Sequence, residues 1–247
     1  MIHPDLYKKA VVLDTQEHRD LKIAKPANPW EPTQAVNSIL IAAVEFGDVC
    51  SDYPILFIDA GKDEEGKSHM APIAALGVAN GENLFVEGNS WRARYIPALI
   101  RAYPFGVARA PGDRLLIMID EAWDGWSRTE GHALFDDQAQ ASQELEDVKA
   151  QLQKIEAEMQ RTRLLGDALL EAGLLSPMRF DAALSDGQKI TVDGFWVVDE
   201  KKLSELPDEK VVEFHRKGVL SLINAHQISM RHMQKLAEWR VARSEAA

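Results

Sequence analysis

Short apolar runs bounded by turn residues dominate the first half of the chain. Five runs have the length and the β-branched or aromatic content of strands: residues 10–14, 55–58, 73–78, 83–86 and 115–120. The dipeptide Asn80-Gly81, between two of these runs, is a strong signal for a tight turn. The succession of strand, turn and strand predicts an antiparallel meander.

Two longer segments carry apolar residues at helical spacing. Residues 34–49 do so at Val36, Ile39, Leu40, Ala43 and Val44, which predicts a helix that ends before Pro54. Residues 142–172 predict one long helix that ends at Gly173, with a narrow seam of Leu145, Val148, Leu152, Ile155 and Met159. A helix docked across the domain is favoured over a dimer zipper, and a homodimer through this seam is the alternative.

The last third of the chain is expected to be mostly helical. We predict a short helix within residues 174–184, a hairpin of residues 188–192 and 195–198 around Asp193-Gly194, and helices over 200–217 and 219–241. Residues 1–33 contain several prolines and predict an extended N-terminal arm. Together the patterns predict a single α+β domain over residues 1–247, with a mainly antiparallel sheet, a long central helix and a helical C-terminus.

Composition narrows the classes of protein and of partner. The 247 residues are 46% hydrophobic, enough for a sizeable core, and the net charge of −11 disfavours nucleic acid and anionic membranes as partners. The one cysteine, Cys50, excludes an internal disulfide and is interpreted as a buried thiol. The N-terminus lacks a secretory pattern, and no apolar stretch approaches the ~18 residues of a membrane span. A cytoplasmic location is therefore expected over the cell surface, with export by a route without a cleaved signal still open.

Familiar catalytic motifs do not occur in the sequence. It has no Gly-x-Gly-x-x-Gly, no Walker-type loop and no Gly-x-Ser-x-Gly, and its seven histidines show no zinc-type spacing. We therefore predict neither a cofactor nor a metal site. His226 lies on the apolar face of a predicted helix, where a hydrogen-bonded core histidine is favoured over a general base.

The segment of residues 91–105 combines aromatic residues, arginines and two prolines. It predicts a short helix over residues 97–103 with tyrosines near both ends. One interpretation is an aromatic staple between a sheet and a helix. The other is an anion- or peptide-binding edge, because arginine stacks on aromatic rings and grips carboxylates. The candidate ligand-binding residues are Trp91, Arg94, Tyr95, Arg101, Tyr103 and, from the C-terminal helix, His226.

Several blocks in this order resemble the SapC family of bacterial proteins. They span roughly residues 10–240: His18-Arg19, Glu45-Phe46, Tyr53-Pro54-Ile55-Leu56-Phe57, Leu76-Gly77, Asn83-Leu84-Phe85, Trp91, Tyr95-Ile96-Pro97-Ala98, Arg101-Ala102-Tyr103-Pro104-Phe105, Gly131, Leu134-Phe135, Val198-Asp199-Glu200-Lys201-Lys202-Leu203, Leu206, Ala225-His226 and Ser229. The block of tyrosine, proline and arginine is the specific part.

The resemblance implies an accessory role rather than a defined reaction. The family name implies a surface-layer link, and the family's genomic setting implies a partner in a halogenase or outer-membrane receptor pathway. The leading hypothesis is a binding protein for a peptide, protein or small-molecule partner. The alternatives are an enzyme of unknown class using His18, Glu45 or His226 with the arginine-aromatic patch, and a surface-layer component.

Overall fold

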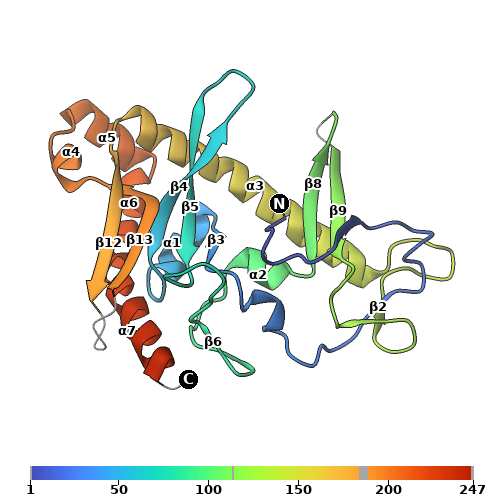
Figure 1. The fold of residues 1–247 in the computed structure, drawn as a ribbon. Coiled ribbons are helices and arrows are strands. Elements are labelled where there is room, and N and C mark those ends of the chain that lie inside the picture. The colour runs from blue at the N-terminus through green and yellow to red at the C-terminus, as the bar shows by residue number, and fades with distance from the viewer. Residues whose placement is uncertain (1, 113, 184–188, 246–247) are drawn as a thin grey trace.

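The largest sheet organises one end of the molecule. The computed structural model describes residues 2–112, 114–183 and 189–245. Five antiparallel strands lie in the order β12-β13-β4-β5-β3: β3 Ser38–Leu40, β4 Ile55–Lys62, β5 Ser68–Ala75, β12 Leu175–Ala183 and β13 Lys189–Val198. The long β4 and β5 form a hairpin that projects beyond the rest of this sheet (Figure 1).

A second antiparallel sheet lies at the other end. It has the order β1-β9-β8: β1 Ala10–Val12, β8 Phe105–Ala110 and β9 Arg114–Asp120. Shorter strands form two small sheets: β2 Lys22–Ile23, β10 Trp126–Ser127 and β11 His132–Ala133 in one, β6 Val86–Glu87 and β7 Ser90–Trp91 in the other.

Helices connect and cover these sheets. They are α1 Phe46–Val49, α2 Ala98–Ala102, α3 Gln143–Glu171, α4 Glu200–Ser204, α5 Asp208–Arg216, α6 Val219–Ser229 and α7 His232–Glu245, with 3-10 turns η1 Glu31–Thr33 and η2 Ala43–Glu45. The predicted α+β class, with a long central helix and a helical C-terminus, is confirmed. Among the described residues, no helix is long and apolar enough to cross a bilayer.

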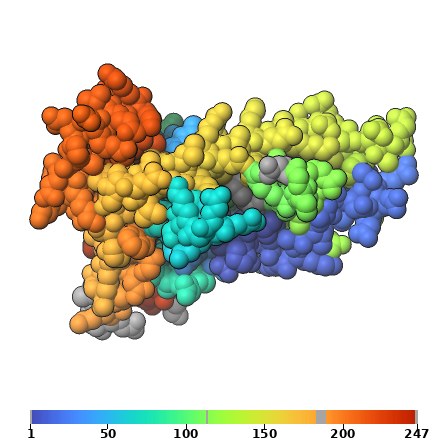
Figure 2. All heavy atoms as spheres, turned by 90° about the horizontal axis from the view of Figure 1, so that it is seen from above, coloured from blue at the N-terminus to red at the C-terminus, as the bar shows by residue number. Residues whose placement is uncertain are grey.

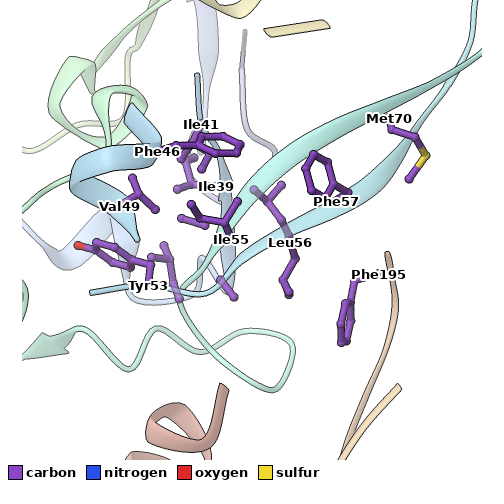
Figure 3. Packing of buried hydrophobic residues seen from close by; sticks show 14 of the residues in the cluster. Ile39, Ile41, Phe46, Val49, Tyr53, Ile55, Leu56, Phe57, Met70 and Phe195 are labelled. Atoms are coloured by element: carbon purple, nitrogen blue, oxygen red, sulfur yellow. The ribbon is translucent and has the colours of Figure 1, made fainter. Parts of the chain in front are cut away.

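The long helix α3 spans two buried clusters. Leu165 and Leu169 pack into the cluster around the five-stranded sheet, and Leu145 and Leu152 pack into a second one beside β8 and β9. Figure 1 shows α3 passing behind both sheets. Side chains from β3, α1 and β4 interlock in the first cluster (Figure 3). The seam predicted from sequence is therefore covered within the chain, as expected for a docked helix.

Local signals fix both ends of α3. The Ser142 hydroxyl accepts a hydrogen bond from the Leu145 backbone N–H, and acidic residues occupy the first turn. At the other end Gly173 adopts a φ of 68°, and the Leu174 N–H bonds back to the Leu169 carbonyl. Only glycine takes this left-handed conformation without steric cost. The predicted helix over 142–172 is thus confirmed.

The predicted helix over residues 34–49 is wrong over most of its length. Residues 38–40 form β3, which pairs with β5, and only residues 46–49 are α-helical. Ile39 and Ile41 are both buried, which is the alternation of a strand. Pairing with β5 supplies the backbone hydrogen bonds that an isolated helix would otherwise make, and it overrides the local pattern.

Four further predictions differ from the structure. Residues 175–183 form β12 rather than a helix. Strand β13 continues through Asp193-Gly194, where a turn was predicted, and residues 184–188 lie outside the described residues. Gly194 has a φ of 80° close to a register shift in the ladder, as in a β-bulge. The predicted helix over 219–241 is two helices, α6 and α7, and strand β8 was not predicted.

Candidate functional site

The segment of residues 91–105 forms a hydrogen-bonded cluster around the side chain of Tyr53. The Tyr53 hydroxyl accepts a hydrogen bond from the Trp91 indole N–H at 2.7 Å and donates one to the Tyr95 carbonyl oxygen. The Tyr95 hydroxyl in turn donates to Glu45 at 2.9 Å, and Arg101 lies 3.3 Å from that hydroxyl. The structure thus brings Trp91, Tyr95 and Arg101 together, with Glu45 beneath them.

Glu45 is the buried centre of this cluster. Its Oε1 also accepts the backbone N–H of Ala98, at the start of α2, and its Oε2 accepts that of Ala42. Burial and the neighbouring Glu45 carboxylate raise the pKa of Tyr95 to about 12, so its hydroxyl stays protonated and donates. The cluster fastens α2, which matches the predicted short helix over 97–103, to η2.

The other candidate residues lie elsewhere. Arg94 is exposed, and its backbone N–H bonds to Asp52. Tyr103 donates its hydroxyl to the fully buried Asp120 at 2.8 Å, and the same carboxylate accepts the backbone N–H groups of Lys8 and Lys9 in the N-terminal arm. Asp120 therefore fastens the arm to the second sheet.

Two residues named for an enzymatic alternative are also engaged. The His18 side chain is buried, and its Nδ1 accepts the Asp14 backbone N–H at 2.9 Å. His226 is buried between strands: its Nδ1 donates to the Ile55 carbonyl at 2.7 Å, and its Nε2 accepts the Val198 N–H at 3.1 Å. Cys50 is half-buried, with its Sγ hydrogen at the Gly47 carbonyl.

His226 should make the fold sensitive to acid. Burial lowers the pKa of His226 from 6.5 to about 4, because the charged ring would lose its hydration, and the hydrogen bond to the Ile55 carbonyl opposes this shift only in part. Stability is therefore full above pH 6.5 and falls as the pH drops towards 4, by up to about 3 kcal/mol. Urea unfolding of the wild type and His226→Gln across this range measures the loss. The variant should be less stable near neutrality and should vary less with pH; parallel curves would contradict the assignment.

A groove runs along the β4–β5 hairpin. One pocket of about 410 Å³ lies between the hairpin and α3, and another of about 350 Å³ lies between the hairpin, α2 and the N-terminal arm. Both are lined by Leu40, Ala60 and Ala71, so they adjoin. We call the two pockets together the hairpin groove. Figure 2 shows hairpins β4–β5 and β8–β9 projecting on the same side of α3.

The floor of the groove is apolar and one end is charged. Leu40, Ile58, Met70, Ile73 and Met159 are among the apolar residues that line it. Side chains of both signs gather where the first pocket meets the tip of the hairpin: Lys62, Asp63, Glu64, His69 and Arg163.

His69 ties the hairpin to α3 at this charged end. Its Nδ1 lies 2.6 Å from Asp167 on α3, and its Nε2 lies 2.9 Å from Asp63 on the hairpin. Hydrogen bonds to Asp167 and then Asp63 raise the pKa of His69, while the nearby Arg163 opposes the rise. The tie is strongest with His69 protonated and weakens as the pH rises through this raised pKa.

The polar side chains in the wall of the groove are engaged within the protein. The Thr162 hydroxyl in its wall already donates to the Glu158 carbonyl and accepts the Ala43 N–H. Both ring nitrogens of His69 face carboxylates, so neither is free to take a proton from a substrate. Within the part of the chain that the structure describes, no three His, Cys, Asp or Glu side chains are grouped to hold a metal ion.

Sequence reasoning missed this site because its parts are far apart in the chain. His69 lies on the hairpin and Asp167 on α3, 98 positions further along the chain. One signal was present: Gly166 sits inside α3, where an ideal Cβ would lie 1.9 Å from the Met70 carbonyl oxygen. A glycine in a helix interior is unfavourable and marks a close approach of another backbone.

Comparison with known proteins gives one match. A family model described as SapC matches residues 13–236, nearly the whole chain. Searches of curated proteins and of solved structures gave no significant match.

Proposed function

The chain belongs to the SapC family, and we propose that it is a binding protein for a small amphipathic molecule held in the hairpin groove. The observation that carries this proposal is the continuity of two pockets through Leu40, Ala60 and Ala71, with charged side chains at one end only. Concave, mostly apolar sites with a few convergent polar groups are the usual form of small-molecule sites.

The apolar floor supplies the affinity. Ile58 and Ala71 face each other on β4 and β5 and are only half-buried. A ligand that covers this strand face gains about 0.8 kcal/mol for each CH₂ it buries. The N-terminal arm closes the far side through Ile2 and Pro4. An elongated apolar body therefore fits the groove better than a compact polar one.

The polar end selects the head group. Lys62 and Arg163 stand there beside Asp63 and Glu64, so the charges nearly balance. A bare ion meets repulsion from one sign or the other, whereas a neutral group that donates and accepts hydrogen bonds can satisfy both. We therefore favour an uncharged polar head.

The protein partner that the genomic setting of the SapC family implies would act together with this groove. A small molecule carried here suits an accessory role in a halogenase or outer-membrane receptor pathway, with the ligand passed to or from a protein partner. The cluster of Trp91, Tyr95 and Arg101, with Arg94 at its edge, stays the proposed alternative surface for an anion or a peptide. An enzymatic role is weaker, because the ring nitrogens of His69 and His226 are occupied.

Binding of a neutral fluorescent probe tests the proposal. N-phenyl-1-naphthylamine is apolar, carries one N–H donor and brightens in dry sites. We expect saturable binding to the wild type and a loss of about tenfold or more in Ala71→Trp, which fills the shared section of the groove. Ala150→Trp, on the exposed face of α3, is the matched control and should bind as the wild type does.

Two outcomes would overturn the groove as the binding site. One is unchanged binding by a folded Ala71→Trp variant, checked by its thermal unfolding. The other is a loss of probe binding in the Arg101→Gln variant while the Ala71→Trp variant still binds the probe. This result would place the ligand at the cluster of Trp91, Tyr95 and Arg101.

A further inference from the structure

A second hollow, separate from the hairpin groove, lies beside the C-terminal helix. It has a volume of about 700 Å³ and is bounded by α7 and by the segment around β6 (Figure 1). Arg92, Trp239 and Arg243 line it together with Gln34, Glu82 and Glu87. We call it the Arg92–Arg243 pocket. It shares none of its lining residues with the groove.

Arg92 is held in place by an aromatic ring. Its guanidinium carbon lies 3.8 Å from the ring centroid of Trp239, and Lys235 approaches the same ring to 4.9 Å. The edge of Trp239 packs against the fully buried Phe85, with centroids 5.2 Å apart. A guanidinium stacked on a fixed ring loses little freedom when it binds an anion.

Arg243 is held by the backbone. Its Nη1 donates to the Asn83 carbonyl at 3.0 Å and its Nη2 donates to the Val86 carbonyl at 2.9 Å. Carbonyl oxygens orient the guanidinium, but they carry no net charge and do not neutralise it. The pocket therefore presents two preorganised cations on a chain whose net charge is −11.

Lys235, which approaches the same Trp239 ring, has neighbours of both signs. Burial is the main cause that lowers the pKa of Lys235; Asp52 opposes this shift, and Arg231 and Arg92 add to it. The acidic side chains of the lining do not cancel both arginines. Glu82 pairs with Arg240 at 3.2 Å, and the exposed Glu87 approaches Arg92 only to 3.6 Å.

We propose that the Arg92–Arg243 pocket binds the carboxylate of a peptide or an amino-acid derivative. A planar carboxylate matches the guanidinium fork of Arg92, which stacks on Trp239. Arg243, whose two Nη atoms already donate to Asn83 and Val86, adds its positive charge. A phosphate dianion fits less well, because Glu82 and Glu87 also line the pocket and would repel the second charge. The exposed amide of Gln34 offers a partner for a peptide bond. The volume admits the one or two residues that precede a C-terminal carboxylate.

A matched pair of dipeptides tests this assignment. N-acetyl-glycyl-phenylalanine carries the free carboxylate, and its C-terminal amide has the same shape without the charge. Both are titrated into the ¹⁵N-labelled full chain, with the Trp239 indole resonance as the readout. We expect the acid to shift this resonance saturably and to bind at least tenfold more tightly than the amide. Inorganic phosphate should compete only weakly.

Arginine variants locate the binding. Arg243→Gln should lose most of the preference for the acid, and Arg243→Lys should keep part of it, since the charge stays while the two hydrogen bonds that orient it on Asn83 and Val86 are lost. Arg216→Gln, on the exposed face of α5 and outside the pocket, is the control and should behave as the wild type does. Equal binding of acid and amide, no shift with either, stronger binding of phosphate, or an unchanged preference in folded Arg243→Gln would each overturn the proposal.

Discussion

Gly166→Ala should destabilise the protein by about 3 kcal/mol, although alanine is the better helix former by about 1 kcal/mol. The pairing of β3 with β5 covers residues 73–75, and α3 crosses the same edge of β5 at Met70. An ideal Cβ at Gly166 would lie 1.9 Å from the Met70 carbonyl oxygen, and both atoms belong to rigid backbone. The helix or the strand must therefore move, which pulls Asp167 away from His69.

Thermal unfolding and binding of the fluorescent probe measure the effect of Gly166→Ala. The midpoint of thermal unfolding should fall by about 10 °C, and binding of N-phenyl-1-naphthylamine in the groove should weaken. Gly47→Ala is the matched control: it lies in α1 with open space around the added methyl group, so its stability should stay level or rise by a few tenths of a kcal/mol, roughly as helix propensity predicts. A Gly166→Ala variant as stable as Gly47→Ala would show that α3 and β5 do not touch in this way.

Glu45→Ala is expected to cost about 3 to 4 kcal/mol, because it leaves buried donors without an acceptor. The carboxylate accepts the backbone N–H groups of Ala42 and Ala98 and the Tyr95 hydroxyl. Since its charge also holds up the pKa of Tyr95, removing it should let that tyrosine ionise at a lower pH.

Denaturant unfolding and a spectroscopic tyrosine titration test both parts. Glu45→Gln keeps one acceptor oxygen and should lose about half as much stability, roughly 1.5 to 2 kcal/mol. Glu130→Ala changes an exposed glutamate and should have almost no effect. If Glu45→Ala unfolds at the same denaturant concentration as Glu130→Ala, Glu45 does not hold α2 in place.

Much of the fold could be predicted where the signal was local. The ends of α3 depend on Ser142 and Gly173, which act on backbone groups within one turn. The break between α4 and α5 precedes residue 208, next to Pro207, and α5 ends at Arg216, two residues before Gly218. Such signals act through the residue's own geometry, so they need no knowledge of the rest of the chain.

Predictions were wrong where distant segments compete with the local pattern. Residues 38–40 are a strand because β5 offers them a hydrogen-bonding edge. Gly194 was interpreted as a turn residue, yet it sits in a bulge inside β13, since pairing with β12 extends the strand past it. Strand pairing is decided between segments, and its register is invisible in either segment alone.

The candidate sites divide in the same way. The segment of residues 91–105 could be recognised from its composition, and the sequence by itself determined the family and the short helix of this segment. Only the tertiary structure decided which arginine faces a pocket: Arg92 stacks on Trp239, almost 150 positions further along the chain, while Arg94 stays at the surface. The tertiary structure also placed His69 beside Asp167, and it joined the two pockets of the hairpin groove at Ala71. Spacing along a helix or strand fixes only near neighbours, whereas a pocket is made where separate elements pack together.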